Sequence, residues 1–199
     1  MPTDPEPPSP LEVAIRSRFD AGDLDGAIAK ALEAYADELF GFLIGLARDR
    51  TQAEDAFSAA CERMWRGLAK FRWDSTFRVW AYRIARNEFL RTTRAVTKAR
   101  KNTPISEIAS VRAAVSKMRS TTPLHQRTEV KDRFAKLREE LDPEDHMLLG
   151  LRIDRKLPWN DIAKVLASSE DEPSAREVAA LRKRFERLKV KLRELAKEA

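Results

Sequence analysis

The segment from Phe71 to Leu90, FRWDSTFRVWAYRIARNEFL, concentrates aromatic rings and guanidinium groups in a chain that is 8% aromatic overall. Such rings can stack on unpaired bases, and neighbouring cations can follow the phosphates of a single strand. The same pattern also fits a core helix with basic flanks. The segment therefore allows two interpretations, a surface that holds unstacked bases or a buried helix. Its rings are Phe71, Trp73, Phe77, Trp80, Tyr82 and Phe89, and its arginines are Arg72, Arg78, Arg83 and Arg86.

The composition argues against metal and enzyme chemistry. Cys61 is the single cysteine, and His125 and His146 are far apart with no CxxC or HExxH motif, so no metal site is expected. Paired carboxylates, a nucleophile triad and a phosphate-binding loop are all missing from the sequence, so we expect neither an enzyme nor a cofactor. The net charge of +6 and the pI near 9.6 favour polyanionic partners.

The first ten residues, MPTDPEPPSP, hold five prolines and predict an extended, disordered tail. They lack the basic and apolar regions of a signal peptide. No run approaches the roughly 18 apolar residues of a membrane span. With a single cysteine, which allows no internal disulfide, these features indicate a cytoplasmic protein.

Apolar residues recur at steps of three and four through most of the chain, which predicts helices, and the six glycines are too few for a sheet rich in tight turns. Thr51 and Glu54 form a capping-box pattern that should open one helix. Asp142 followed by Pro143, and Ser174 followed by Glu177, should open two more. In the first half we expect helices at residues 11–19, 23–46, 51–68 and 75–92. In the second half we expect them at 143–151, 158–166 and 174 onward.

The chain is therefore expected to be all-α, with two small helical domains joined by a flexible linker. Residues 96–127 are rich in Thr, Ser, Lys and Arg and poor in apolar side chains, which indicates the linker. The predicted organisation is a tail at 1–10, a first domain at 11–95, the linker, and a second domain at 128–199.

The last two predicted helices suggest a helix-turn-helix, whose second helix enters the DNA major groove. That helix carries one apolar seam, formed by Leu181, Phe185, Leu188, Leu192 and Leu195. Its other face is basic, which suits phosphates and guanine edges. An ordinary solvated face would look similar. The candidate DNA-binding residues are Arg176, Arg182, Lys183, Arg184 and Arg187.

Both halves together resemble a bacterial sigma factor of the extracytoplasmic-function type, over about residues 20–95 and 130–196. FRWDSTFRVWAYRIARN, residues 71–87, resembles the family pattern F-R-G-D-S-x-F-x-x-W-L-Y-R-I-A-x-N. TQAEDAFSAACERMWRGL, residues 51–68, resembles the helix that starts with a D-A-E-D-type motif. LPWNDIAKVLA and LRKRFERLKVKLREL, residues 157–167 and 181–195, resemble the two helices that bind the −35 element.

The resemblance implies an alternative sigma factor that has no catalysis of its own. Its partners would be promoter DNA and core RNA polymerase, through the clamp of the largest subunit and the flap of the second-largest, with an anti-sigma factor or a Ser/Thr kinase as regulator. The first domain would bind and melt the −10 element, with Trp73 the most exposed ring and Trp80 and Ile84 in the core. The implied −10 residues are Phe71, Arg72, Trp73, Asp74, Ser75, Phe77, Arg83, Arg86 and Asn87. The implied polymerase-binding residues are Glu54, Asp55, Ser58 and Glu62.

Three departures from the family pattern bear on function. Ser58 and Ala59 stand where the clamp-binding helix usually has Gln-Glu, which removes a carboxylate. Phosphorylation of Ser58, or of Thr51, would restore charge to this helix. Trp73 replaces the glycine of the F-R-G-D-S loop. The turn between Leu166 and Leu181 is longer than in the family and includes Glu170, Asp171 and Glu172.

Two other classes of protein remain open. One is a helical, phosphorylation-dependent adaptor that has lost polymerase binding, which the altered clamp helix favours. The other is an ordinary helix-turn-helix repressor, which would bind duplex DNA tightly without polymerase.

Overall fold

The computed structural model describes residues 8–47, 49–95, 113, 116, 141–167 and 171–198. The chain divides into two compact units, Met1–Ser120 and Thr121–Ala199. The regular structure in the described ranges is helical, without a strand, so the all-α prediction is confirmed. The predicted linker and residues 1–7 of the predicted tail lie outside these ranges, apart from two isolated linker positions.

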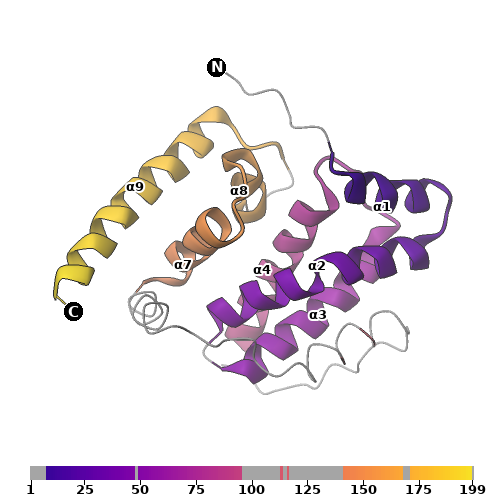
Figure 1. Ribbon diagram of the computed structural model, residues 1–199, viewed down its shortest axis with the longest axis horizontal. Coiled ribbons are helices and arrows are strands. Elements are labelled where there is room, and N and C mark those ends of the chain that lie inside the picture. The colour runs from indigo at the N-terminus through magenta and orange to yellow at the C-terminus, as the bar shows by residue number, and fades with distance from the viewer. Residues whose placement is uncertain are drawn as a thin grey trace. The chain divides into compact units, whose positions relative to one another are not determined.

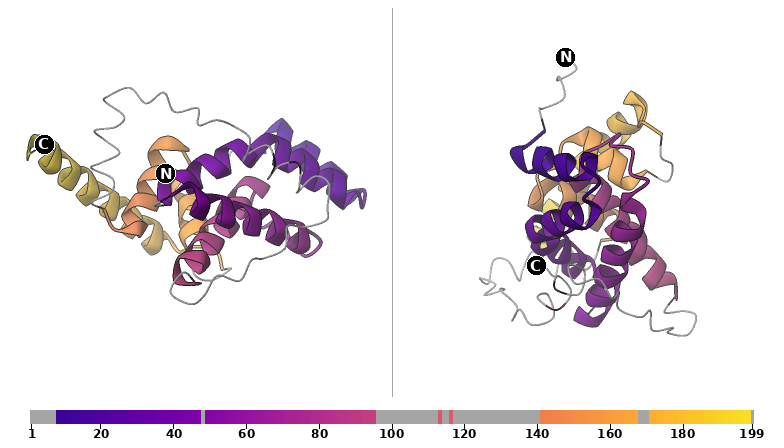
Figure 2. Two further views of the ribbon diagram at one scale, coloured as in Figure 1. Left: turned by 90° about the horizontal axis from the view of Figure 1, so that it is seen from below. Right: turned by 90° about the vertical axis from the view of Figure 1, so that its right-hand side faces the viewer.

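The first unit is a bundle of α1 (Pro10–Asp20), α2 (Leu24–Leu46), α3 (Arg50–Leu68) and α4 (Phe77–Ala95), which pack against one another in Figures 1 and 2. The periodicity of the sequence places one side of each helix in a common core. The fully buried side chains include Ile15, Ile28, Leu39, Leu43, Phe57, Met64, Leu68 and Tyr82.

Short polar side chains begin three of these helices. The Oδ1 atom of Asp23 accepts a hydrogen bond from Gly26 N, and Ser9 and Asp49 cap α1 and α3 in the same way. The prediction that Thr51 caps the third helix is wrong, because Asp49 accepts from Gln52 N at 2.8 Å and Thr51 already lies in the first turn. An aspartate is as good an acceptor as threonine, and it stands two residues earlier.

The second unit contains α7 (Pro143–Leu149), the π-helical turn η1 (Gly150–Asp154), α8 (Trp159–Leu166) and α9 (Ala175–Glu198). The predicted starts at Asp142 and Ser174 are confirmed: Asp142 accepts from Glu144 N and Asp145 N, and Ser174 and Glu177 bond to each other reciprocally. The π turn was not anticipated by the sequence pattern. Met147, Leu148, Leu151, Ile162 and Val165 form the core of this unit.

The apolar seam of α9 is confirmed only in its middle. Phe185 and Leu188 are buried, whereas Leu192 and Leu195 are half-exposed. Val178, outside the predicted seam, is buried near the start of the helix. None of the helices in the described part of the chain is long and apolar enough to cross a membrane.

Candidate functional site

The loop between α3 and α4, residues 69–76, and the first turn of α4 carry a cluster of rings that belongs to the protein core. Phe71 is 9% exposed and stacks on Trp80 with 4.6 Å between ring centroids. Phe77 is fully buried, 5.4 Å from Trp80 and 6.3 Å from Tyr35. The rings of Phe71 and Phe77, expected to touch DNA, are therefore used for packing and shape the loop from beneath. Trp80 is half-buried, as is Ile84, so these two lie at the core's edge rather than inside it.

Trp73 is half-buried, and like Trp80 it is more exposed than the buried rings of Phe71, Phe77, Tyr82 and Phe89. Its edge meets Phe19 with 5.5 Å between centroids, and the Arg16 guanidinium carbon lies 4.9 Å from its ring centroid. Its φ of 61° falls in the left-handed region, where the family pattern has glycine. Its indole Nε1 is buried without a hydrogen-bond partner among the described residues. Contacts with α1 thus hold Trp73 in an unfavourable backbone conformation.

The polar residues of the loop form its accessible rim. Arg72 Nε and Asp74 Oδ2 are 2.9 Å apart, and both side chains are exposed. Ser75 is half-buried and donates its hydroxyl to Thr76 O. Of the predicted −10 residues in the loop, Arg72, Asp74 and Ser75 are those whose polar side chains remain accessible to a ligand.

The other predicted −10 residues lie farther along α4. Asn87 is exposed, and its Oδ1 accepts from Arg86 at 3.2 Å. Ten residues from the start of α4, Asn87 is about 15 Å from the loop along the helix axis. Arg83 is half-buried, whereas Arg86 is buried, so the Arg86 guanidinium is not on the surface as expected. The structure therefore groups the loop residues and separates them from Asn87.

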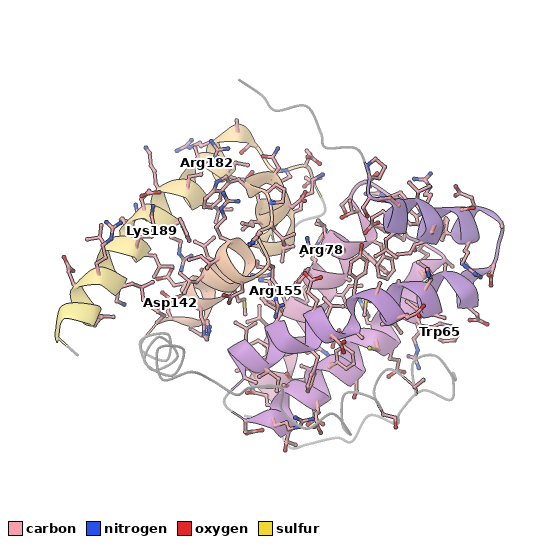
Figure 3. The ribbon with its side chains drawn as sticks, in the orientation of Figure 1. Trp65, Arg78, Asp142, Arg155, Arg182 and Lys189 are labelled. Carbon is pink, nitrogen blue, oxygen red and sulfur yellow. The ribbon has the colours of Figure 1, made fainter. Side chains whose placement is uncertain are left out.

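Sequence reasoning missed two carboxylates that organise the base of this region. Glu38 on α2 accepts from Arg78 Nε at 3.0 Å, from Arg78 Nη2 and from the Tyr82 hydroxyl at 2.7 Å. Burial opposes the charge of Arg78, but Glu38 outweighs it and raises the pKa of that guanidinium. The guanidinium of Arg78, which is labelled in Figure 3, is therefore held by Glu38 within the bundle. The second carboxylate, Glu12, is buried against the start of α4. In the sequence, the signal for these two carboxylates was an acidic residue within an otherwise apolar helix face.

The candidate polymerase-binding helix, α3, is electrically balanced. Glu54 pairs with Arg50 at 2.7 Å, and Glu62 pairs with Arg66 at 2.6 Å. Counting Asp55 and Arg63 as well, the three acids of α3 face three arginines, and its formal charge is zero. The loss of the usual carboxylate is therefore compounded by neutralising partners on the same helix. Asp55 is exposed.

The two candidate phosphosites differ in their surroundings. The Ser58 hydroxyl donates to Glu54 O at 2.8 Å, and the side chain is half-buried in the middle of α3. Thr51 is exposed in the first turn, beside the positive end of the helix dipole. A phosphate at Thr51 would meet favourable backbone N–H groups, whereas one at Ser58 would lie a turn from Glu54 and from Glu62.

In the second unit, α8 packs on α9 through Trp159 and Phe185, whose centroids are 5.4 Å apart. Arg176, Arg182, Lys183 and Arg187 are exposed on α9. Arg184 differs from these predicted DNA-binding residues, because its guanidinium meets Asp145 at 2.5 Å, Glu144 at 2.7 Å and Asp142 at 3.2 Å. Figure 3 marks Asp142 at the start of α7. Arg184 is thus turned toward α7.

Comparisons with known proteins agree with this arrangement. Residues 31–99, covering most of α2 and all of α3 and α4, match the model for Sigma-70 region 2. The sigma factor RpoE of Bartonella quintana, solved in complex with the anti-sigma factor NepR, has a similar fold. The TM-score is 0.61 at 19% identity, over 84% of this chain and 95% of that one. No curated protein matches the sequence.

Residues 31–99, on the bundle that carries the loop, thus match a sigma-factor region, and the fold of the chain is similar to that of a solved sigma factor.

Proposed function

We propose that the chain is an alternative sigma subunit that binds core RNA polymerase and promoter DNA and directs initiation without catalysis of its own. The match of residues 31–99 to Sigma-70 region 2 supports this proposal, because it covers most of α2 and all of α3 and α4, the helices that hold the loop. The core polymerase supplies the chemistry of RNA synthesis. The two units are taken as sigma domain 2, residues 11–95, and sigma domain 4, residues 128–199.

In domain 2, the rim of the loop would hold an opened −10 strand. Arg72, Asp74 and Ser75 provide hydrogen-bonding groups for a base edge, and Arg83 and Asn87 lie along the same helix farther on. The buried rings of Phe71 and Phe77 support the loop rather than stacking on bases. Melting would follow from preferential binding of the opened strand, whose contacts offset an unstacking cost of a few kcal/mol per base.

In domain 4, α8 and α9 would form the helix-turn-helix that binds the −35 element. Arg176, Arg182, Lys183 and Arg187 present a basic face to the groove. Arg184 would support this face by fixing α9 to α7. Lys164 pairs with Glu172 at 3.0 Å, which compensates one of the acidic charges in the long turn.

Polymerase docking would be regulated through α3. A helix of zero formal charge should bind a basic clamp surface weakly, and a phosphate adds about −1.5 to −2 of charge. Of the two candidates, Thr51 has the better setting, being exposed and in the first turn. The structural neighbour is bound to an anti-sigma factor, which supports such a protein as an additional partner here.

The test is binding of the purified chain to bacterial core RNA polymerase, comparing the unmodified protein with Thr51→Glu and Ser58→Glu. We expect weak binding by the unmodified chain and binding about tenfold tighter with Thr51→Glu, a gain of about 1.4 kcal/mol, because the added carboxylate attracts the basic clamp surface. The Ser58→Glu variant should gain less.

Each outcome assigns the chain to a class. Equally tight binding by the unmodified and the kinase-phosphorylated chain would support the sigma function and rule out a phosphorylation switch. No binding by any form, including a phosphorylated sample, would replace the sigma function with the adaptor. Tight duplex binding without polymerase would indicate a repressor.

A further inference from the structure

The carboxylate of Glu12 on α1 is buried, 5% exposed, and reaches three donors on two other helices. Its Oε2 accepts from Phe77 N at 2.8 Å. Its Oε1 accepts from Arg78 N at 3.0 Å and from the Tyr35 hydroxyl at 2.9 Å. Glu12 stands outside residues 31–99, which match Sigma-70 region 2. A buried charge of this kind is stable only when it is hydrogen-bonded from several sides, as it is here.

Glu12 completes the cap of α4. The first N–H groups of a helix have no partner within the helix, and a negative charge beside them is favourable. Thr76 supplies only part of the cap, because its Oγ1 accepts from Val79 N at 3.2 Å. Glu12 takes the two preceding groups, Phe77 N and Arg78 N. The start of α4, where the loop ends, is therefore held by a residue sixty-five positions earlier in the chain.

Helix α1 also holds the middle of the loop. Arg16 lies over the ring of Trp73, and Phe19 meets its edge. Trp73 has a left-handed φ, and its indole N–H is buried without a partner among the described residues, so neither feature by itself would keep it in place. Two separate contacts from α1, at Trp73 and at Phe77, thus determine the shape of the loop that carries Arg72, Asp74 and Ser75.

We propose that Glu12 is a positioning residue for binding of the opened promoter strand, and that α1 is a structural part of this binding site. The proposal rests on the proposed function of the loop. Glu12 itself does not touch DNA. Its carboxylate fixes the first turn of α4, and this turn sets the direction in which the loop leaves Thr76 and presents its polar rim.

Two variants separate this role from general stability. Glu12→Gln keeps one side-chain oxygen, which can still accept from the Tyr35 hydroxyl and from Arg78 N. Its NH2 group then faces Phe77 N and cannot accept a hydrogen bond from it. Tyr35→Phe is the matched control, because it removes one donor to the same carboxylate and leaves both backbone bonds intact.

The first measurement is amide hydrogen exchange in the free chain. Glu12→Gln should raise exchange at Phe77 N by about tenfold, the effect of losing a helix cap, with Ala60 N in α3 unchanged. Tyr35→Phe should leave Phe77 N as in the wild type. If Glu12→Gln fails to fold, the wild type still decides: fast exchange at Phe77 N and Arg78 N would overturn the proposal, and slow exchange would support it.

The second measurement is binding of polymerase holoenzyme to two probes, one with a single-stranded −10 region and one with only a duplex −35 element. We expect Glu12→Gln to weaken binding to the opened probe by about tenfold, again by the loss of one cap, with the duplex probe unchanged. Wild-type affinity for the opened probe would overturn the role of Glu12 while leaving the sigma function intact. If wild-type holoenzyme does not bind the opened probe, the proposed function itself fails.

Discussion

Arg184 on α9 and Asp142 at the start of α7 are forty-two residues apart in the chain and lie 3.2 Å from each other in the structure. The same guanidinium also reaches Glu144 and Asp145, so one cation meets three carboxylates in the first turn of α7. Burial disfavours the charge of Arg184, but these carboxylates outweigh it and raise the pKa of the guanidinium. This cluster, rather than apolar packing alone, fastens the middle of α9 to the rest of the second unit.

Replacing Arg184 should therefore affect folding, and replacing Arg187 should affect DNA binding. We expect Arg184→Gln to lower the free energy of unfolding of the second unit by about 1 kcal/mol, the upper range for a partly exposed network. Arg187→Gln, at an exposed position, should change it by less than about 0.5 kcal/mol. Chemical denaturation monitored by the Trp159 environment measures both values.

The effect of the same two substitutions on DNA binding is measured through the salt dependence of the affinity. Arg187→Gln should reduce the slope of log affinity against log salt for a −35 duplex by about 1, as expected for one phosphate contact. Arg184→Gln should keep the wild-type slope. A reduced salt slope with Arg184→Gln, together with an unchanged salt slope with Arg187→Gln, would reverse the roles assigned to these two arginines.

Acid should loosen the second unit through Asp142. Burial opposes ionisation of this carboxyl, but hydrogen bonds from Asp145 and Glu144 and the charge of Arg184 lower its pKa below 3.8. Because the unfolded chain binds this proton more readily, the stabilisation is complete above pH 3.8 and is lost as the pH falls through the lowered value. Glu177 contributes in the same direction, since its bonds with Ser174 lower its pKa from 4.5.

Thermal unfolding between pH 5 and pH 2 tests this prediction, with Asp142→Asn as the comparison. The asparagine keeps an acceptor oxygen for the cap but cannot ionise. Its melting temperature should fall less steeply with acid than that of the wild type. Parallel curves for the two proteins would show that Asp142 does not carry the effect.

At position 73, glycine should be tolerated better than alanine. Both substitutions remove the ring contacts with Phe19 and Arg16, but only glycine adopts a φ of 61° without a steric cost. We expect Trp73→Gly to be more stable than Trp73→Ala by about 1 kcal/mol, the usual penalty of the left-handed region. Urea denaturation of the two variants gives this difference directly, and equal midpoints would mean that the loop relaxes to another backbone conformation.

Removing a cation from α3 should strengthen polymerase binding without phosphorylation. Arg66→Gln frees Glu62 and takes α3 from zero to −1 in formal charge. Because the Arg66 side chain is 68% exposed whereas the Glu62 side chain is 15% exposed, the change should lower the free energy of unfolding by up to about 1 kcal/mol. We expect core polymerase to bind the variant a few-fold more tightly at low salt, with the gain fading as screening increases.

The control for that experiment is Lys30→Gln, which removes one charge from an exposed ion pair with Glu33 on α2. It changes the net charge of the chain equally and leaves α3 untouched. A similar gain with Lys30→Gln would point to overall charge rather than to the α3 surface.

The sequence by itself determined the helices and most of their ends, because these depend on interactions within a few residues. The caps at Asp142 and Ser174 and the spacing of apolar residues in α2 and α9 are of this kind. The missed cap at Asp49 also follows from local rules, since two acceptors competed and the earlier one took the helix start. The resemblance to sigma factors likewise came from short, contiguous motifs.

Only the tertiary structure decided which side chains of those motifs are available. Phe71 and Arg72 are neighbours in the loop, yet one is buried in a ring stack and the other is exposed. Arg184 and Arg187 are one turn apart on α9, and their roles differ because α7 brings three carboxylates to one of them. Glu12 meets Phe77 across sixty-five residues of chain. Such contacts depend on how helices pack, and nothing in the spacing of nearby residues encodes the partner that a distant helix will supply.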